Sequence, residues 1–457
     1  MKSPVAARPR GRKSCGGVRF AVFLILYFTL LPGSATADAS PPTDQQQASA
    51  EALTLGSALR LFREHGFDLL IANASVDAAE ADVRIATALP NPALSLSRGS
   101  SSTYDPSRCN GCSSHSTGAS VTDQGALSDL LTGKRRLRVA VARAARDASK
   151  SSRAEVERTL ELTVKEQLLQ AELAKRSLDY AREAQQLAGD TLDLVEKRYR
   201  AGAVSEADVA RAAVQKLEAE QSADASAQAL ASAKAGLAYL LGFTFTPENL
   251  DVADDLLRAA PPADLDHVTA DAMLREALRR RPDLAQMRSL FERARSSLTL
   301  AQRMIVPDLL PSLSYSAEGR GQNAIQPPTV TFGIAATIPV FYRYRGEIAR
   351  AEADIRAQQT AEHKVEAQIA SDVSAAVAAF HGAHSRVTRM DDELLARAAR
   401  ARDLVRLQYE KGAVSLFEYL DVQRTWLATR TEYLQTLNDY WTAVFQLEQA
   451  TGMEIRP

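Results

Sequence analysis

The longest pattern in the chain is a helical one. Between about Gly133 and Arg200, apolar positions recur every three or four residues, and the segment contains no proline and one internal glycine, Gly189. A second segment with the same spacing runs from about Arg345 to Lys411. At 1.5 Å per residue, each predicted helix would be roughly 100 Å long. Many of the apolar positions are alanine, which favours close helix packing in a thin wall over a thick core.

A period of two residues, which is typical of strands, appears in shorter pieces. It is clearest at TVTFGIAATIPVF, where every second residue from Val330 to Ile338 is apolar. Residues 313–317 and 94–96 alternate in the same way. The segment His115–Leu127 alternates poorly, and we predict a strand there mainly from its place in the repeat described next. Each piece has roughly the 9–11 residues that a tilted strand needs to cross a bilayer.

The chain contains one structural plan twice. The segments YRAGAVSEADV and YEKGAVSLFEYL share a tyrosine, Gly-Ala-Val-Ser and an acid, and Gly412 follows Gly202 by 210 positions. In each copy we expect a helix, two strands, a very long helix, the GAVS corner and a second helix that ends at glycine. The predicted boundaries are 1–37 for a signal peptide, 38–52 for a linker, 53–242 for the first copy, 243–266 for a connecting segment, 267–452 for the second copy and 453–457 for a tail.

The two GAVS corners are predicted to be tight turns between antiparallel helices. They comprise Gly202, Ala203, Val204 and Ser205 in the first copy and Gly412, Ala413, Val414 and Ser415 in the second. The glycines can take the left-handed conformation that ends a helix. The serines are predicted N-caps, and Asp208 and Glu418 stand three residues later, where an acid completes a capping box.

Turn formation explains the glycine and the serine of each corner, but not its Ala-Val pair. We expect both pairs to be exposed at the tips of the helical hairpins. Exposed apolar side chains at two symmetric places indicate a docking surface.

The N-terminus indicates export. Residues 1–37 carry six basic residues and no acid, then an apolar run from Phe20 to Leu31, and then Ala35-Thr36-Ala37, which has the form of a cleavage site before Asp38. This pattern predicts a secretory signal peptide. Removing its six basic residues from a chain of net charge −1 leaves about −7, which argues against nucleic-acid binding. No later segment offers about 20 consecutive apolar residues, so a membrane-spanning part would have to consist of strands.

The order of these segments resembles the TolC family of outer-membrane efflux proteins, above all its heavy-metal branch. LPNPALSLS and IPVFYRYRGEIARAEADI are similar to that family's strand entry and strand-to-helix transition, and TGKRRLRVAVARAA is similar to the transition in the first copy. The resemblance implies a mainly α fold with a small β part. Three chains with four strands each would form a 12-stranded outer-membrane β-barrel, and the helical hairpins would form a periplasmic tunnel. Residues 243–266 would form an equatorial belt with the chain ends.

The function that the resemblance implies is passive transport. A homotrimer in the outer membrane would conduct substrates, heavy-metal cations among them, from a periplasmic adaptor and an inner-membrane pump of the RND type to the outside. No cofactor and no catalytic residue are implied. The sequence itself contains no nucleophile elbow, phosphate loop or complete set of metal ligands, and we therefore expect no enzymatic activity.

The family also implies a gate. In its members, two acids three positions apart on the helix after the second corner surround the closed periplasmic mouth, and here they fall on Glu418 and Asp421. Residues at this spacing share one helix face, and rings of carboxylates favour cations and raise the pKa of their own members. The first copy has Asp208 but Arg211 at these places, and Val414 stands where some members have an arginine. The alternative is that Glu418 only caps its helix and Asp421 is solvated.

Cysteine and histidine give weaker signals. Cys109 and Cys112 lie in the predicted outer loop between the first two strands. A disulfide between them is the first interpretation for an exported chain, while metal binding together with His115 and free thiols are the alternatives. His381 and His384 lie one helical turn apart and are predicted to be solvated or to face the lumen.

Two other functions fit parts of the pattern. A duct for protein secretion would have the same fold, and a periplasmic coiled-coil or adaptor protein would share the helices without a barrel. The two proline-flanked strand pairs argue against the second alternative. The cargo cannot be inferred from the chain alone, because the lining of a duct need not recognise what passes through it.

Overall fold

A computed structural model of the chain describes residues 52–100, 114–246, 250–253, 256–257, 269–318, 326–390 and 394–453. The chain divides into one unit of residues 1–47 and a second of residues 48–457, and the second unit is described below. The predicted signal peptide, the pair Cys109 and Cys112, and most of the predicted tail lie outside the described residues.

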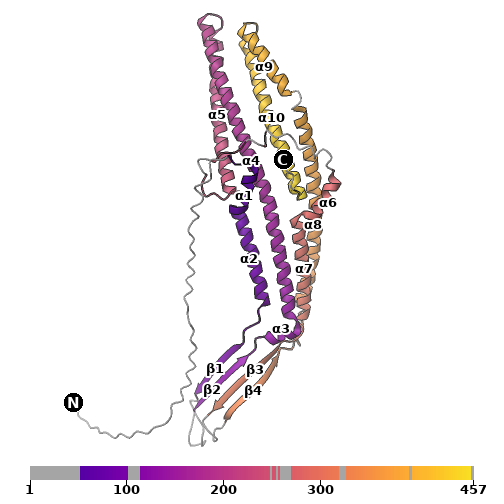
Figure 1. The fold of residues 1–457 in the computed structure, drawn as a ribbon. Coiled ribbons are helices and arrows are strands. Elements are labelled where there is room, and N and C mark those ends of the chain that lie inside the picture. The colour runs from indigo at the N-terminus through magenta and orange to yellow at the C-terminus, as the bar shows by residue number, and fades with distance from the viewer. Residues whose placement is uncertain are drawn as a thin grey trace, which may run out of the picture. The chain divides into compact units, whose positions relative to one another are not determined.

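The described part is mainly helical, with four strands, and the element order is that of a duplicated plan (Figure 1). The first copy contains α1 (Leu55–His65), α2 (Phe67–Thr87), β1 (Ala93–Ser100), β2 (His115–Thr122), α3 (Ala126–Thr132), α4 (Lys134–Arg200) and α5 (Glu206–Leu240). The second contains α6 (Ala270–Arg280), α7 (Pro282–Arg303), β3 (Leu309–Glu318), β4 (Gln326–Ala336), α8 (Arg345–Arg389), α9 (Leu395–Glu410) and α10 (Leu416–Thr451). The strands gather at one end of the helices, and both GAVS corners lie at the other end.

The four strands form one antiparallel sheet in the order β1-β2-β3-β4. The predicted strand from His115 ends at Thr122 instead of Leu127. The reason is Asp123, whose carboxylate accepts hydrogen bonds from the backbone N–H groups of Gly125, Ala126 and Leu127. These bonds start the short helix α3, which the alternation pattern did not predict.

The first helix of each copy is broken in the same place, whereas the sequence pattern predicted a single helix. In the first copy, Gly66 separates α1 from α2 in an extended conformation with φ −58° and ψ 119°. In the second copy, Pro282 begins α7 and holds Arg281 at φ −65° and ψ 126°. A residue before proline is driven out of the helical region, and proline fits the first helical position.

The long helix predicted from Arg345 to Lys411 is also wrong in one respect, because the structure divides it into α8 and α9. Met390 and Leu394, on either side of residues 391–393, are π-helical, a wider turn that interrupts regular α-helical hydrogen bonding. The predicted helix from Gly133 to Arg200 is confirmed as α4, which has 67 residues.

The main core lies midway along the helices, where α4, α8 and α10 meet. Its largest fully buried side chains include Trp441, Tyr440 and Phe380. Both copies end their last helix against this region with a left-handed glycine, Gly242 at φ 84° and Gly452 at φ 67°. A Cβ atom at Gly242 would lie only 2.2 Å from the carbonyl oxygen of His65, so the chain needs glycine here.

Candidate functional site

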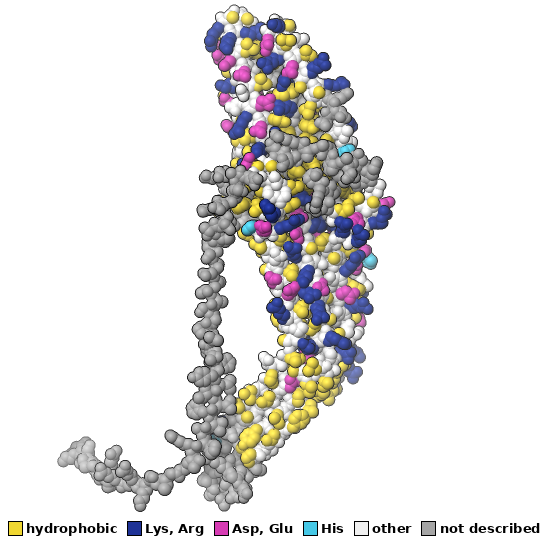
Figure 2. All heavy atoms as spheres, viewed as in Figure 1, with side chains coloured by type: hydrophobic (Ala, Val, Ile, Leu, Met, Phe, Trp, Pro, Cys, Tyr) yellow, Lys and Arg dark blue, Asp and Glu magenta, His cyan; other side chains and the backbone are white. Residues whose placement is uncertain are grey.

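One face of the sheet is apolar in its central rows, and most of the side chains there are exposed. Leu94, Val121, Leu313 and Phe332 form one row across the four strands, and Leu96, Ala119, Tyr315 and Val330 form the next. The side chains of Leu96 and Phe332 are 75% and 68% exposed. Figure 2 shows hydrophobic side chains gathered over the strands, while charged side chains cover the helices. Such a continuous exposed apolar surface indicates contact with lipid or with another chain.

The opposite face of the sheet is polar, small and uncharged in its central rows. One row consists of Ser95, Ser120, Ser314 and Thr331, and the next of Ser97, Gly118, Ser316 and Thr329. A Cβ atom at Gly118 would lie 2.6 Å from the hydroxyl of Ser97, so packing on this face favours the smallest residues. A sheet with one apolar and one polar face is the pattern of strands between lipid and an aqueous lumen.

The two tips at the far end of the helices have nearly identical backbone turns. Gly202 and Gly412 have φ values of 73° and 76°, in the left-handed region. The N–H of Ala203 donates to the carbonyl of Arg198, and the N–H of Ala413 donates to the carbonyl of Gln408, both over 2.9 Å. These bonds are those of a Schellman C-cap, and they confirm the predicted turns.

The helices that leave the tips are capped differently. Ser205 and Asp208 form the predicted capping box, in which the Ser205 hydroxyl accepts from the Asp208 N–H and the Asp208 carboxylate accepts from the Ser205 N–H over 3.0 Å. Hydrogen bonds from Ser205, first from its hydroxyl and then from its N–H, lower the pKa of Asp208 below its usual range. At the second tip, Ser415 accepts from the Glu418 N–H over 3.2 Å, and no return bond from Glu418 is formed.

The two candidate gate acids are both exposed on the first turns of α10. Glu418 makes no ion pair or side-chain hydrogen bond to any residue that the structure describes. Asp421 forms an ion pair of 3.0 Å with Arg424, three residues further along the same helix. The predicted capping box at Ser415 and Glu418 is therefore wrong, because only the serine makes its bond. The Glu418 carboxylate is available for another role.

The expectation of an exposed Ala-Val pair at each tip is wrong for the valines. Val204 and Val414 are partly buried against a cluster that includes Val195 and Tyr409, because the turn directs them between the helices. Ala203 and Ala413 are exposed, as expected.

The most exposed large apolar side chain at the tips was not among the residues predicted from the sequence. Phe417 is 68% exposed on α10, and its counterpart in the first copy is Ala207. Comparison of the two copies position by position would have shown this difference.

An arginine of the first tip contacts the second tip directly. The guanidinium of Arg198 in α4 donates a hydrogen bond of 3.1 Å to the backbone carbonyl of Tyr409 in α9 and lies 4.8 Å from the centre of the Tyr409 ring. That ring stacks in parallel on Tyr419 of α10, with 5.0 Å between the centroids. The counterpart of Arg198 in the second copy is Gln408. This contact could not be predicted from the sequence, because it depends on how the two hairpins pack.

Comparison with protein families decides the assignment. The model of the outer membrane efflux protein family matches residues 58–243 and 273–453, one match for each copy. The chain belongs to this family. The duplicated plan, the amphipathic sheet and the helical hairpins are thus those of an outer membrane efflux protein, located in the outer membrane with its helices extending into the periplasm.

Relatives support the same conclusion. The efflux protein is 23% identical over 411 residues to the cobalt-zinc-cadmium resistance protein CzcC of Cupriavidus metallidurans, covering 88% of this chain and 91% of the relative. It is 28% identical over 294 residues to the pyoverdine export outer membrane protein OpmQ of Pseudomonas aeruginosa, covering 63% of this chain and 60% of the relative.

Solved structures share the fold. The fold of the chain matches crystal structures of CusC with a TM-score of 0.70 at 20% identity, over 88% of this chain and 92% of the other. It matches the open state of the Neisseria gonorrhoeae MtrE channel with a TM-score of 0.71 at 19% identity, over 87% and 89%.

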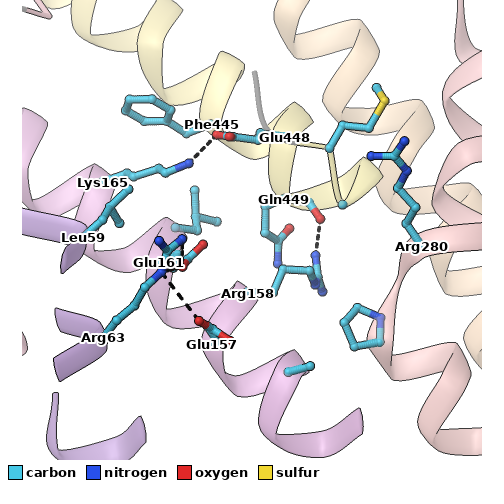
Figure 3. A pocket seen from close by; sticks show the side chains of 15 residues that line it. Leu59, Arg63, Glu157, Arg158, Glu161, Lys165, Arg280, Phe445, Glu448 and Gln449 are labelled. Atoms are coloured by element: carbon cyan, nitrogen blue, oxygen red, sulfur yellow. Dashed lines mark hydrogen bonds and ion pairs between the residues drawn. The ribbon is translucent and has the colours of Figure 1, made fainter. Parts of the chain in front are cut away.

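A buried ion pair connects the first structural repeat of the chain to the second (Figure 3). Lys165 of α4 and Glu448 of α10 point toward one another, with 2.6 Å between Nζ and Oε2, and their side chains are only 10% and 8% exposed. Nearby, Arg158 donates to the carbonyl of Gln449, and a cavity of about 300 Å³ lies beside these residues. The junction fixes α4 of the first copy to the end of α10 in the second.

The structure also bears on the predictions for the two histidines, for metal binding and for membrane-spanning helices. His384 stacks on Phe380 with 5.8 Å between ring centroids and is half-buried, while His381 is exposed. Within the described ranges, no three His, Cys, Asp or Glu side chains come close enough together to bind a metal ion. In the same ranges, every helix is too short or too polar to cross a membrane.

Proposed function

We propose that the chain works as a homotrimer whose sheets join edge to edge into a 12-stranded β-barrel. The observation that carries this proposal is the four-stranded sheet itself. Within the described residues, β1 and β4 each have one edge without a partner strand, and the central rows of one face are apolar. Unpaired N–H and C=O groups cannot remain open in hydrocarbon, and four strands are too few to close a barrel. Three chains supply 12 strands, and pairing of β4 in one chain with β1 in the next chain removes both edges.

In this assembly the chain is the passive exit duct of a tripartite pump. The polar faces of the sheets line a lumen that offers small uncharged groups and so hinders few solutes. The tips dock onto a periplasmic adaptor protein, which connects the duct to an energised inner-membrane pump of the RND type. Heavy-metal cations are the proposed cargo, and the similarity to CzcC over nearly the whole chain supports this choice.

Glu418 and Asp421 are the proposed acids of the periplasmic gate. Both are exposed near the second tip, and Glu418 is not occupied by capping. In a trimer they would form two carboxylate rings at the mouth of the tunnel, which attract cations.

Two measurements test the proposal. Native mass spectrometry of the detergent-solubilised protein should give three chains, and a folded monomer would contradict the barrel. A strain that lacks the protein should become sensitive to cobalt, zinc and cadmium, and the intact gene should restore resistance. Sensitivity to organic compounds alone would show that the duct is correct and the cargo is wrong.

A further inference from the structure

The short helix α3 has its polar side inward and its apolar side outward. The Ser128 hydroxyl donates a hydrogen bond of 2.7 Å to Asp308, and Asp129 accepts from Arg138 over 2.9 Å, while Ser128 and Asp129 are only 1% and 6% exposed. The exposed residues are three leucines, Leu127, Leu130 and Leu131. This arrangement is the reverse of a helix on a protein surface in water, where polar residues face the solvent. It is the arrangement expected of a helix whose surroundings are apolar.

The second copy exposes apolar side chains at the corresponding point, where the chain passes from β4 to α8. Ile338, Val340 and Tyr342 are 68%, 61% and 57% exposed, and Phe341 is completely exposed. Ile338 continues the two-residue alternation of the lipid-facing side of β4, which contains Phe332. The apolar surface of the sheet therefore extends beyond the strands instead of ending with them.

Basic side chains accompany these apolar segments. Arg136 lies in the first turn of α4. Arg343 and Arg345 follow Phe341 and Tyr342 in the chain, and Arg350 lies further along α8. All four are exposed, and none forms an ion pair with another residue that the structure describes. Lys134 differs, because it is buried and paired with Asp308 over 2.8 Å.

We propose that these segments form a collar that binds the anionic phospholipids of the periplasmic leaflet of the outer membrane. The collar consists of Leu127, Leu130, Leu131, Ile338, Val340, Phe341 and Tyr342, with Arg136, Arg343, Arg345 and Arg350. The leucines and aromatic rings enter the boundary between headgroups and acyl chains, where such side chains are enriched, and the guanidinium groups bind lipid phosphates. The proposal rests on the placement of the sheet in the bilayer proposed above.

A lipid surface fits the collar better than a second copy of the chain does. The apolar residues are continuous with the face of the sheet that must contact lipid. The guanidinium groups require anions, and each arginine near an anionic surface contributes about fivefold to binding.

Tryptophan substitution with brominated lipids tests the collar. The chain has two tryptophans, Trp426 and Trp441, both buried in α10 and away from the sheet. In Leu131→Trp and Phe341→Trp trimers reconstituted into vesicles, brominated phospholipid should quench the fluorescence of the introduced tryptophan. Leu96→Trp on the sheet serves as the lipid-exposed reference, and Phe417→Trp at the tip should not be quenched.

Each result has one meaning. If Leu96→Trp is quenched and either collar variant is not, the collar is wrong and another chain or the lumen faces that segment, while the placement of the sheet stands. If Leu96→Trp is not quenched, the proposed barrel itself is wrong.

The headgroup preference needs a second comparison. At low salt, brominated phosphatidylglycerol should quench Phe341→Trp at least about twofold more than brominated phosphatidylcholine at equal mole fraction. Adding Arg343→Gln and Arg345→Gln, or raising the salt to about 0.5 M, should abolish the difference, because exposed charges are then screened. Equal quenching by both lipids in the Phe341→Trp protein at low salt would overturn the anionic-lipid assignment.

Discussion

The guanidinium of Arg198 and the backbone carbonyl of Tyr409 form a hydrogen bond of 3.1 Å, and this bond joins the two hairpin tips of one chain. The same guanidinium lies over the Tyr409 ring and near the left-handed Gly412, where an added Cβ atom would be 3.7 Å away. One side chain of the first copy thus completes the turn of the second. The second copy has Gln408 at the place of Arg198, and this uncharged side chain cannot make the equivalent cation–π contact.

Replacing Arg198 should loosen the second tip more than the first. Arg198→Gln removes a charged hydrogen bond and a cation–π contact, which together are worth about 1–3 kcal/mol. Hydrogen exchange at the amides of Gly412 and Ala413 should therefore become roughly tenfold faster or more, while the amides of Gly202 and Ala203 change little.

Arg200→Gln is the matched control for this experiment. Arg200 lies two residues away, and its side chain pairs only with Glu196 on the same exposed helix surface. Equal exchange at the second tip in the two variants would show that the contact between the tips has no energetic weight.

The two capping acids should differ in their effect on stability. Asp208→Ala removes half of a capping box and should cost about 1 kcal/mol at the start of α5. Glu418→Ala should cost less at the start of α10, because its carboxylate returns no bond to Ser415. Hydrogen exchange in the first turns of the two helices measures both effects, and equal losses would contradict the difference in capping.

The pH dependence follows from the lowered pKa of Asp208. A carboxylate with a depressed folded-state pKa adds stability above its unfolded pKa of about 3.9, and this stability is lost as the pH falls through the folded value. The effect of Asp208→Ala on exchange should therefore be constant near neutral pH and disappear in strong acid. A steady decline between pH 8 and 6 would indicate another titrating group.

The sequence predicted most of the architecture because the architecture is periodic. The strand containing Phe332 and the helix α4 were both evident from the spacing of apolar residues, and the duplication transferred weak evidence from one copy to the other. The breaks at Gly66 and Arg281 were missed because single residues interrupt an otherwise continuous helical period. Gly66 gave only a weak signal, whereas the proline after Arg281 was visible in the sequence.

The candidate site was less predictable, for physical reasons. Whether Val204 points outward or inward depends on the turn that positions it, and Arg198 contacts Tyr409 only through packing of segments 211 residues apart. Neither relation has a local period. The identities of Glu418 and Asp421 came from resemblance, and their role at the gate stays a prediction.

Adaptor docking should depend on the exposed residues of the tips. Ala203→Asp, Ala413→Asp and Phe417→Asp place a charge on exposed positions without filling the packed interior, so the trimer should persist while metal resistance in cells is lost. Val204→Asp is a poor test, because this half-buried valine would also damage the tip itself. Exposed Ala210→Asp on α5 is the control and should leave resistance intact. Unchanged resistance in all three tip variants would limit the turns to a structural role.

The buried junction between Lys165 and Glu448 should be costly to break from one side. Lys165→Met removes the ammonium partner of a Glu448 carboxylate that is only 8% exposed, and breaking a buried ion pair from one side typically costs about 3–5 kcal/mol. The double variant Lys165→Met with Glu448→Gln removes both charges and should recover most of the stability. Thermal unfolding of the purified trimer measures the difference, and additive losses in the double variant would show that the two groups do not interact.

Conduction through the trimer should depend more on Glu418 than on Asp421. The Asp421 charge is partly balanced by Arg424 at 3.0 Å, whereas Glu418 has no cationic partner among the described residues. In a planar bilayer, multivalent cations added from the periplasmic side should block the current, because a ring of carboxylates concentrates them. Glu418→Gln alone should relieve the greater part of that block, Asp421→Asn a smaller part, and the double variant nearly all of it, together with a weaker preference for cations.

Glu206→Gln is the matched control for the gate variants, because Glu206 is an exposed acid in the first turn of α5 at the other tip. It changes the same charge on the same kind of helix end, and it should leave the block as it is. If the double variant is blocked as strongly as the unmodified trimer, these acids do not line the mouth. If Glu206→Gln relieves the block equally, the effect comes from the general negative potential of the tips, and the two proposed rings have no specific role.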